Sequence, residues 1–195
     1  YIAASTFPNL KAYATGITTG IVSAFTITEP TFNWTTTYTP PNKNNLIIYE
    51  MLLRDFDVVG ISDIGDFNKA LTHLDYLQNL GINAIELMPV NEFEGNDSWG
   101  YNPDFHGALD KAYGTPTNYK TFINECHKRG IAVIMDVVYN HAFGQSPLAQ
   151  MWWDSANNRP SATNPYLNPI PKHDFNVGND FNHESTYTKT YVKET

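Results

Sequence analysis

The stretch IAVIMDVVYNH, residues 131–141, begins as an apolar strand and ends in polar residues. Its first five residues are apolar, as in a parallel strand covered on both faces, and Asp136 interrupts the apolar run. Asn140 and His141 follow at the carboxyl end. In α/β folds, substrates bind at the carboxyl ends of parallel strands. The stretch therefore predicts a parallel sheet and a polar site at the end of one of its strands.

Two preceding segments have the pattern of amphipathic helices that end at a glycine. The first begins at Asp66, which is suited to a helix N-cap, and stops at Gly81, and the second stops at Gly130. Each glycine is followed by Ile and a short apolar strand, and an earlier apolar run begins at Leu46. The order strand, helix, strand, helix, strand is typical of an α/β protein with a parallel sheet.

Composition divides the chain into three parts. Residues 1–45 hold eleven Thr and three charged residues, which favours β-strands or extended coil at the end of an N-terminal β-rich domain and its linker. Residues 46–141 carry the three strands of the predicted sheet. Residues 142–195 are rich in Asn, Pro, Tyr and His and lose the alternating pattern. We expect a loop or small domain inserted after the third strand, followed by the start of the next helix.

The overall composition excludes several classes of partner. Hydrophobic residues make up 42% of the 195 residues, and the formal net charge is −8. Nucleic acids and anionic membranes both need clustered cations, which the sequence lacks. No apolar stretch approaches the ~20 residues of a membrane span. Low charge and many Thr and Asn residues favour an extracytoplasmic protein: periplasmic, cell-surface or secreted.

Aromatic residues follow the second predicted strand. The loop SWGYNP, residues 98–103, contains Trp99 and Tyr101, with Gly100 and Pro103 to hold its shape. A tyrosine in such a loop can stack on the apolar face of a sugar ring. The alternative is a compact surface loop that packs these aromatic rings against the neighbouring helices.

The polar end of 131–141 also allows two interpretations. In one, Asp136 organises a polar network, Asn140 offers its carbonyl to a metal or a loop, and His141 donates to a substrate hydroxyl. In the other, an arginine and neighbouring amides hold Asp136, and His141 is a core histidine with satisfied hydrogen bonds.

A metal-dependent hydrolase is a further hypothesis. Its metal triad would consist of Asp136, His141 and either His173 or His183, although their spacing fits no standard pattern of metal ligands. A Ser/His/Asp hydrolase has even less support, because the sequence contains no G-x-S-x-G motif. It contains no Gly-rich phosphate-binding loop either.

Several motifs in order resemble glycoside hydrolase family 13, the α-amylase family. They are GINAIELMPV, SWGYNP, DKAYGTP, HKRGIAVIMDVVYNH and FNVGNDFNHES. The resemblance runs from about Leu46 to the end of the chain, and it is closest to pullulanase- and branching-enzyme-like members and to α-amylases of Bacteroides-type bacteria. Residues 1–25 also resemble the end of the β-sandwich that precedes the barrel in such enzymes.

The resemblance implies a (β/α)₈ barrel, here represented by its first three units, which acts on α-1,4- or α-1,6-linked glucans with retention of configuration. Tyr101 would stack on the glucose at the cleavage point, with Trp99 shaping the loop, and His141 would bind a hydroxyl of the same glucose. Asp136 would order the network beneath the catalytic centre. Asn140 would support the following loop, as a calcium ligand in many members. One departure from the family pattern is His106, where members usually carry Tyr or Phe.

The resemblance also implies that the catalytic residues lie outside these 195 residues. A retaining glycosidase needs a carboxylate nucleophile and a carboxylic acid/base, which the family places on the fourth and fifth strands. The sequence therefore predicts an N-terminal fragment of an enzyme that is inactive alone and prone to self-association. The alternative is a non-catalytic carbohydrate-binding or interaction protein with a degenerate amylase-like barrel.

Overall fold

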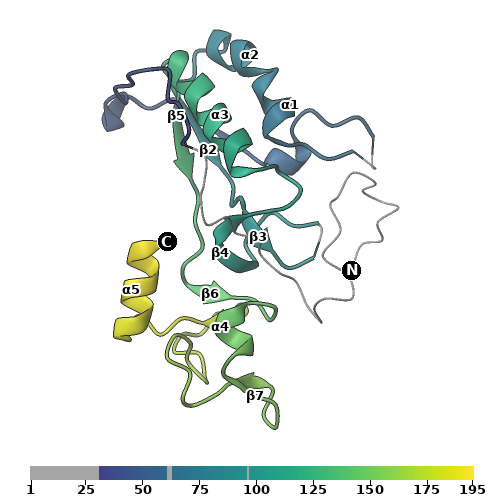
Figure 1. Cartoon of the computed structure of the whole chain (residues 1–195), viewed down its shortest axis with the longest axis vertical. Helices are drawn as coiled ribbons and strands as arrows, with labels where there is room; N and C mark the ends of the chain where they lie inside the picture. The colour runs from purple at the N-terminus through teal and green to yellow at the C-terminus, as the bar shows by residue number, and fades with distance from the viewer. Residues whose placement is uncertain (1–30, 61–62, 96) are drawn as a thin grey trace. The chain divides into compact units, whose positions relative to one another are not determined.

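The computed structural model describes residues 31–60, 63–95 and 97–195 (Figure 1). These residues form two compact units, which are described one at a time. Among the described residues, unit 2 contains 91–108 and 137–195, and unit 1 contains the remainder. The prediction of a β-rich domain concerns mostly residues 1–30, which lie outside the described part of the chain.

Unit 1 is built on a parallel sheet of three strands. β1 (Ile48–Met51), β2 (Ala84–Leu87) and β5 (Ala132–Met135) lie in the order β1-β2-β5. Ile48 aligns with Ala84, and Ala84 aligns with Ala132. The predicted α/β class with a parallel sheet is thereby confirmed.

The first predicted helix forms as two short helices, α1 (Phe67–Leu71) and α2 (Leu74–Asn79). The Asp66 side chain caps α1 by accepting from the backbone N–H of Lys69 at 2.8 Å, as predicted. At the break, the Thr72 hydroxyl donates to the Lys69 carbonyl, and His73 pairs with Asp57 across 2.9 Å.

The second predicted helix is α3 (Pro116–Lys128), and its predicted end is confirmed. Thr115 and Asn118 form a reciprocal capping box at its start. Gly130 has φ of +73° just past its end, and Gly81 has φ of +87° past α2. Both glycines therefore adopt the left-handed conformation that stops a helix.

Aromatic rings form the centre of the unit 1 core. Phe67 of α1 and Phe122 of α3 are both fully buried, with ring centroids 5.7 Å apart. Tyr113, just before α3, meets Phe67 edge-on at 6.5 Å. The contact between these rings holds α1 against α3. Its contribution to stability is large, since truncation of a buried Phe to Ala typically costs about 3–5 kcal/mol.

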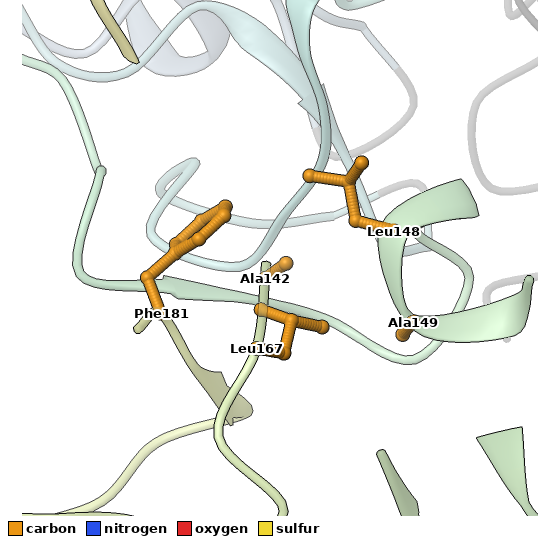
Figure 2. Close-up of a cluster of buried hydrophobic side chains, with 5 residues drawn as sticks. All are labelled: Ala142, Leu148, Ala149, Leu167 and Phe181. Carbon is orange, nitrogen blue, oxygen red and sulfur yellow. The ribbon is translucent and has the colours of Figure 1, made fainter. Parts of the chain in front are cut away.

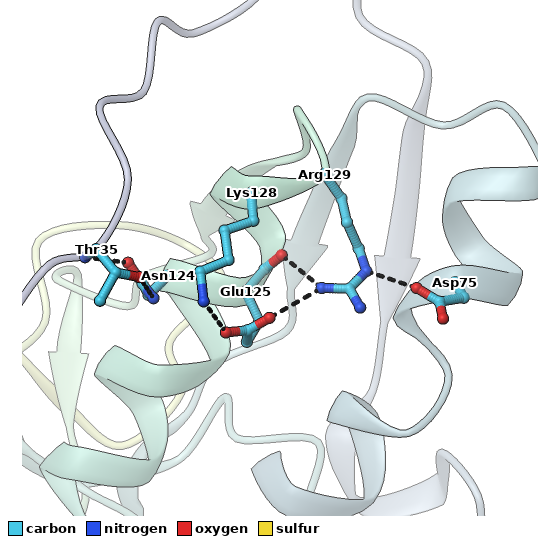
Figure 3. Close-up of polar contacts among 6 residues, drawn as sticks. All are labelled: Thr35, Asp75, Asn124, Glu125, Lys128 and Arg129. Atoms are coloured by element: carbon cyan, nitrogen blue, oxygen red, sulfur yellow. Dashed lines mark hydrogen bonds and ion pairs between the residues drawn. The ribbon is translucent and has the colours of Figure 1, made fainter.

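Residues 31–42 form neither helix nor strand, and two 3₁₀ turns follow, at Lys43–Asn45 and Leu53–Asp55. The segment is tied to α3 by Thr35: its N–H donates to Asn124 Oδ1 at 3.1 Å, and its hydroxyl accepts from Asn124 Nδ2 at 2.9 Å (Figure 3). Next to it, the ring of Tyr38 stacks on His127 with centroids 3.8 Å apart.

Arg129 at the carboxyl end of α3 connects that helix to α2. Its Nε donates to Asp75 at 2.8 Å, and its Nη1 donates to Glu125 (Figure 3). Because Asp75 is largely exposed, this ion pair contributes little net stability.

Unit 2 consists of small elements. β3 (Asn91–Phe93) pairs with β4 (Pro103–Leu109), which runs into unit 1 at its last residue. The remaining elements are β6 (His141–Ala142), which pairs antiparallel with β9 (Asn179–Asp180), β7 (Trp153–Asp154), which pairs with β8 (Arg159–Pro160), α4 (Pro147–Gln150) and α5 (Thr186–Glu194).

A small hydrophobic cluster holds unit 2 together. It comprises Ala142 of β6, Leu148 and Ala149 of α4, and Leu167 and Phe181 from the segment that leads to α5 (Figure 2). The side chain of Tyr191 on α5 packs against this cluster, which fixes the predicted helix at the end of the chain. No helix in the described part of the chain is long and apolar enough to cross a membrane.

Candidate functional site

The loop that carries Trp99 and Tyr101 joins β3 to β4 in unit 2. Asn102 holds the two strands together, since its Nδ2 donates to the Glu94 carbonyl at 2.9 Å and its own carbonyl accepts from the Glu94 N–H at 3.0 Å. Ser98 bonds to Asn102 and accepts from the N–H of Gly100. The ends of the loop are therefore fixed by side chains from within the loop itself.

Both aromatic residues of this loop remain accessible. Trp99 is 60% exposed and Tyr101 is 38% exposed. A loop that packed its aromatic rings against its own helices would bury them, so the structure favours the interpretation as an exposed aromatic surface.

His141 is buried beside this loop, at the start of β6. Its Nε2 lies 2.8 Å from the main-chain oxygen of Tyr101, and its Nδ1 lies 3.0 Å from Oδ1 of Asn140. The structure thus brings the main chain of Tyr101 and the side chain of Asn140 to the ring of His141. Both ring nitrogens are engaged within the protein, as in the alternative in which His141 has satisfied hydrogen bonds.

The protonation of His141 follows from these partners. Burial lowers the pKa of His141, so its ring is neutral near pH 7. The carbonyl of Tyr101 only accepts, so Nε2 carries the proton and Nδ1 has a lone pair. An Nδ1 lone pair needs a donor, and the Asn140 amide provides one when it is turned so that its NH₂ group, rather than Oδ1, faces Nδ1. Both ring nitrogens of His141 then have a partner.

Asp136 takes a different place from the one predicted. It lies just past the end of β5 in unit 1 rather than inside the strand, and it is half-buried. Its N–H donates to the Leu87 carbonyl at 2.9 Å, which extends the pairing between β5 and β2. The apolar run that the sequence shows on both sides of Asp136 is therefore not one continuous strand, because β5 ends at Met135.

The described residues around Asn140 do not fit a calcium site. Calcium takes six to eight oxygen ligands, usually including carboxylates. The Asn140 side chain is engaged by His141, and the carboxylate of Asp180, on the strand paired with β6, already accepts from Asn168, His173 and a backbone N–H. The described residues near Asn140 therefore do not supply the oxygen ligands that calcium requires.

The metal-triad hypothesis fails on the same grounds. Among residues 31–60, 63–95 and 97–195, no three His, Cys, Asp or Glu side chains are grouped so that they could hold a metal ion. His173 contacts Asp180, and His183 lies against the ring of Phe181. The histidines are used in separate local contacts.

His106 occupies the position where family members usually carry Tyr or Phe, and it still acts as a packed ring. It is buried on β4, stacked on Tyr139 at 5.8 Å and edge-on to Phe181 at 5.3 Å. Its Nε2 lies 3.2 Å from the main-chain oxygen of His141. The departure noted in the sequence therefore adds a hydrogen bond to the backbone of the residue expected to bind sugar.

Asp104 is a site residue that sequence patterns did not indicate. It lines a cavity of ≈ 280 Å³ with His106, Ser146 and Tyr191. Asp104 is 1% exposed, and neither carboxyl oxygen has a hydrogen-bond partner of normal geometry. Burial, together with repulsion from Glu94, raises the pKa of Asp104 to about 7, against the opposing effect of the Gln145 N–H. The sequence around Asp104 did not predict its burial, because residues of α4 and α5, far along the chain, cover it.

Comparisons with known proteins agree with this fold. A family model described as alpha amylase, catalytic domain, matches residues 35–191. The chain is 39% identical over 116 residues to malto-oligosyltrehalose trehalohydrolase from Saccharolobus solfataricus, which covers 59% of this chain and 20% of that protein. It is 36% identical over 121 residues to oligo-1,6-glucosidase from Parageobacillus thermoglucosidasius, which covers 62% of this chain and 20% of that protein.

A solved structure gives the same result at the level of fold. Eubacterium rectale Amy13B superposes with a TM-score of 0.58 and 27% identity, covering 80% of this chain and 35% of that chain. The chain spans about a fifth of the length of the curated relatives named above. The family match extends over most of the chain and includes every candidate site residue, so the chain belongs to the α-amylase family, glycoside hydrolase family 13.

Proposed function

We propose that this chain supplies part of the glucose-binding wall of a retaining glycosidase that acts on α-linked glucans. The α-amylase family model supports this class of enzyme, and so do the glycosidase names of the relatives. Because the chain spans about a fifth of those relatives, the activity and substrate of the whole protein are part of the proposal.

The observation that carries the proposal is the direct link between the exposed aromatic loop and His141. The 2.8 Å bond from His141 Nε2 to the Tyr101 carbonyl joins a ring suited to stacking with a hydrogen-bond donor. Sugars need both, because they present apolar C–H faces and polar hydroxyl edges. Loop and imidazole together therefore offer the two kinds of contact that a glucose unit requires.

A sugar hydroxyl can enter this arrangement without leaving a buried group unpaired. A hydroxyl both donates and accepts, so it can accept from His141 Nε2–H and donate to the Tyr101 carbonyl. In the proposed complex the hydroxyl replaces the direct bond between the two residues. The neutral ring of His141 provides the required donor, since Nε2 carries its proton.

Hydrolysis needs further groups. A retaining glycosidase uses two carboxyl groups about 5–5.5 Å apart. We propose that this pair lies outside the 195 residues and that the chain alone binds glucan without cutting it. Release of reducing sugar from starch or maltoheptaose by the purified chain would contradict this. The alternative of a non-catalytic binding protein predicts that no such pair follows in the longer gene product.

A binding titration tests the proposed role of the aromatic loop. With maltoheptaose as the probe in calorimetry, we expect Tyr101→Ala to weaken binding about tenfold, the effect of about 1.4 kcal/mol. Tyr76→Ala is the matched control, because Tyr76 is 60% exposed on α2 of unit 1 and lies outside the proposed site. Equal binding by the Tyr101 variant and the wild type would refute the proposal.

We also propose that the chain self-associates through its sheet. β1 and β5 are the edge strands of the described parallel sheet, and Ile48 and Met135 on them are 47% and 41% exposed. Unpaired edges with apolar side chains are templates for pairing with another chain. Light scattering should show a mass that rises with concentration; a constant monomer mass would contradict the proposal.

A further inference from the structure

The segment from Leu167 to Phe181 folds back along the strand that carries His141. Leu167 and Phe181 form an antiparallel bridge at its ends, and the N–H of Phe181 donates to the Asn140 carbonyl at 3.0 Å. β9 pairs with β6 so that Asp180 stands opposite His141. The backbone of this segment therefore packs alongside the strand that carries His141.

The Asp180 carboxylate closes this segment through three donors. Oδ2 accepts from Asn168 Nδ2 at 2.7 Å and from the N–H of Lys172 at 3.2 Å, and Oδ1 lies 3.1 Å from His173 Nε2. The main-chain oxygen of Asp180 also accepts from the N–H of Asn168 at 2.8 Å. Asp180 is buried, where a carboxylate without donors would be very costly, so these contacts determine where β9 lies.

Gly178 brings the same segment into direct contact with the His141 ring. Its φ is +62°, and a Cβ at this position would lie 2.9 Å from the Ala142 carbonyl and 3.1 Å from His141 Cδ2. A side chain there would displace either the β6 backbone or the imidazole. The segment is therefore built to approach His141 more closely than any residue other than glycine permits.

From these contacts we propose that Asp180, held by Asn168 and His173, is a positioning residue that fixes the His141 ring for sugar binding. The proposal rests on the proposed function for the role of His141, but it concerns how the ring is held. It assigns to protein side chains the anchoring of this loop that a bound cation would otherwise supply. In the sugar-free chain, His141 is bonded to the Tyr101 carbonyl, and β9 lies against the strand that carries His141.

Side-chain NMR of His141 in the sugar-free 195-residue chain tests the positioning directly. We expect Asp180→Asn to shift the His141 Nε2 and Nδ1 signals, because Asn has one acceptor oxygen for three donors. Lys172→Ala is the matched control: Lys172 uses only its backbone N–H at Asp180, and its side chain pairs with exposed Glu184. Unchanged His141 signals in a folded Asp180→Asn variant would overturn the proposal.

A second pair of variants keeps the test valid if Asp180→Asn does not fold. The His173 side chain is 43% exposed, so its replacement leaves no large cavity. His173→Gln retains a side-chain N–H donor and should keep the wild-type His141 signals, whereas His173→Ala should shift them. Identical spectra for the Ala and Gln variants would contradict a role for this donor. Gly178→Ala should also shift the His141 signals, because its Cβ would lie 3.1 Å from His141 Cδ2.

Two further measurements separate this proposal from its alternatives. Addition of EDTA or of calcium chloride should leave the His141 signals unchanged, and a calcium-dependent shift would contradict anchoring by protein side chains alone. Maltoheptaose is then titrated into wild type and His173→Ala, with about tenfold weaker binding expected in the variant. If His141 shifts in His173→Ala but the wild type does not bind maltoheptaose, the positioning stands and the proposed function fails.

Discussion

The main-chain oxygen of Tyr101 accepts a hydrogen bond of 2.8 Å from Nε2 of His141. This bond connects the loop between β3 and β4 with strand β6, which are far apart in the sequence. One partner carries an exposed ring and the other is a buried donor. Loss of either partner therefore affects both the shape of the loop and the sugar contacts proposed for it.

Replacement of His141 by Ala should weaken both folding and binding. The Tyr101 carbonyl then loses its donor, and the loss of one such hydrogen bond typically costs about 0.5–1.5 kcal/mol. Urea denaturation and a maltoheptaose titration measure the two effects. His183→Ala serves as the control, because His183 is exposed and lies outside the proposed site. Wild-type stability and binding in His141→Ala would exclude the role assigned to this bond.

Asp104 should make the chain less stable as the pH rises. Its pKa is about 7 in the folded chain and 3.8 unperturbed, so the folded state holds a proton through this interval that the unfolded state releases. The stability difference between Asp104→Asn and wild type should thus grow in favour of Asn from about pH 4 to about pH 7, by at most about 1.4 kcal/mol per pH unit. A difference that does not change with pH, measured by thermal unfolding, would contradict the buried carboxyl.

His106 should have the opposite pH dependence. Burial lowers the pKa of His106 to about 4 from 6.5, so the unfolded state binds the extra proton and wild-type stability falls as the pH falls through this range. His106→Phe removes this dependence and the bond to the His141 carbonyl together. We expect the variant to be less stable than wild type near pH 7 and to recover relative to it toward pH 4. Equal pH profiles for both proteins would show that His106 is not buried.

The sequence predicted the elements whose determinants are local. Asp66, Gly81 and Gly130 stand at the helix ends where their backbone preferences place them. The three apolar strands also pair in parallel, since a continuous apolar run between helices has few other arrangements. The break in the first helix was not predicted, and it lies where His73 meets Asp57, a contact that the helical pattern does not show.

The candidate site was predicted only in part for a similar reason. The order of the apolar strands in the sequence pointed to the segments of Tyr101 and His141, and the structure joins them through one hydrogen bond. The environment of Asp104 depends on coverage by α4 and α5, and that of Asp180 on a loop closed by Asn168 and His173. Such contacts arise from tertiary packing and leave no periodic pattern in the sequence.

The two hydrogen bonds between Thr35 and Asn124 should stabilise unit 1. Asn124 is buried and bonds to both the N–H and the hydroxyl of Thr35 (Figure 3). Asn124→Ala leaves the Thr35 groups unpaired and should cost about 1–2 kcal/mol in the free energy of unfolding. A double-mutant cycle with Thr35→Ala measures the coupling, which should exceed about 0.5 kcal/mol. Additive effects of the two substitutions would show that the two side chains do not interact in solution.

The most direct test of the central claim is a maltoheptaose titration followed by side-chain NMR of the histidine and tyrosine rings. If Tyr101 and His141 form one glucose-binding wall, their signals shift together and saturate with a single dissociation constant, while those of Tyr76 and His183 stay unchanged. The His141 Nε2–H should remain bonded throughout, because the sugar hydroxyl replaces the Tyr101 carbonyl as its acceptor. Saturable binding that shifts neither Tyr101 nor His141, or no binding, would contradict the claim.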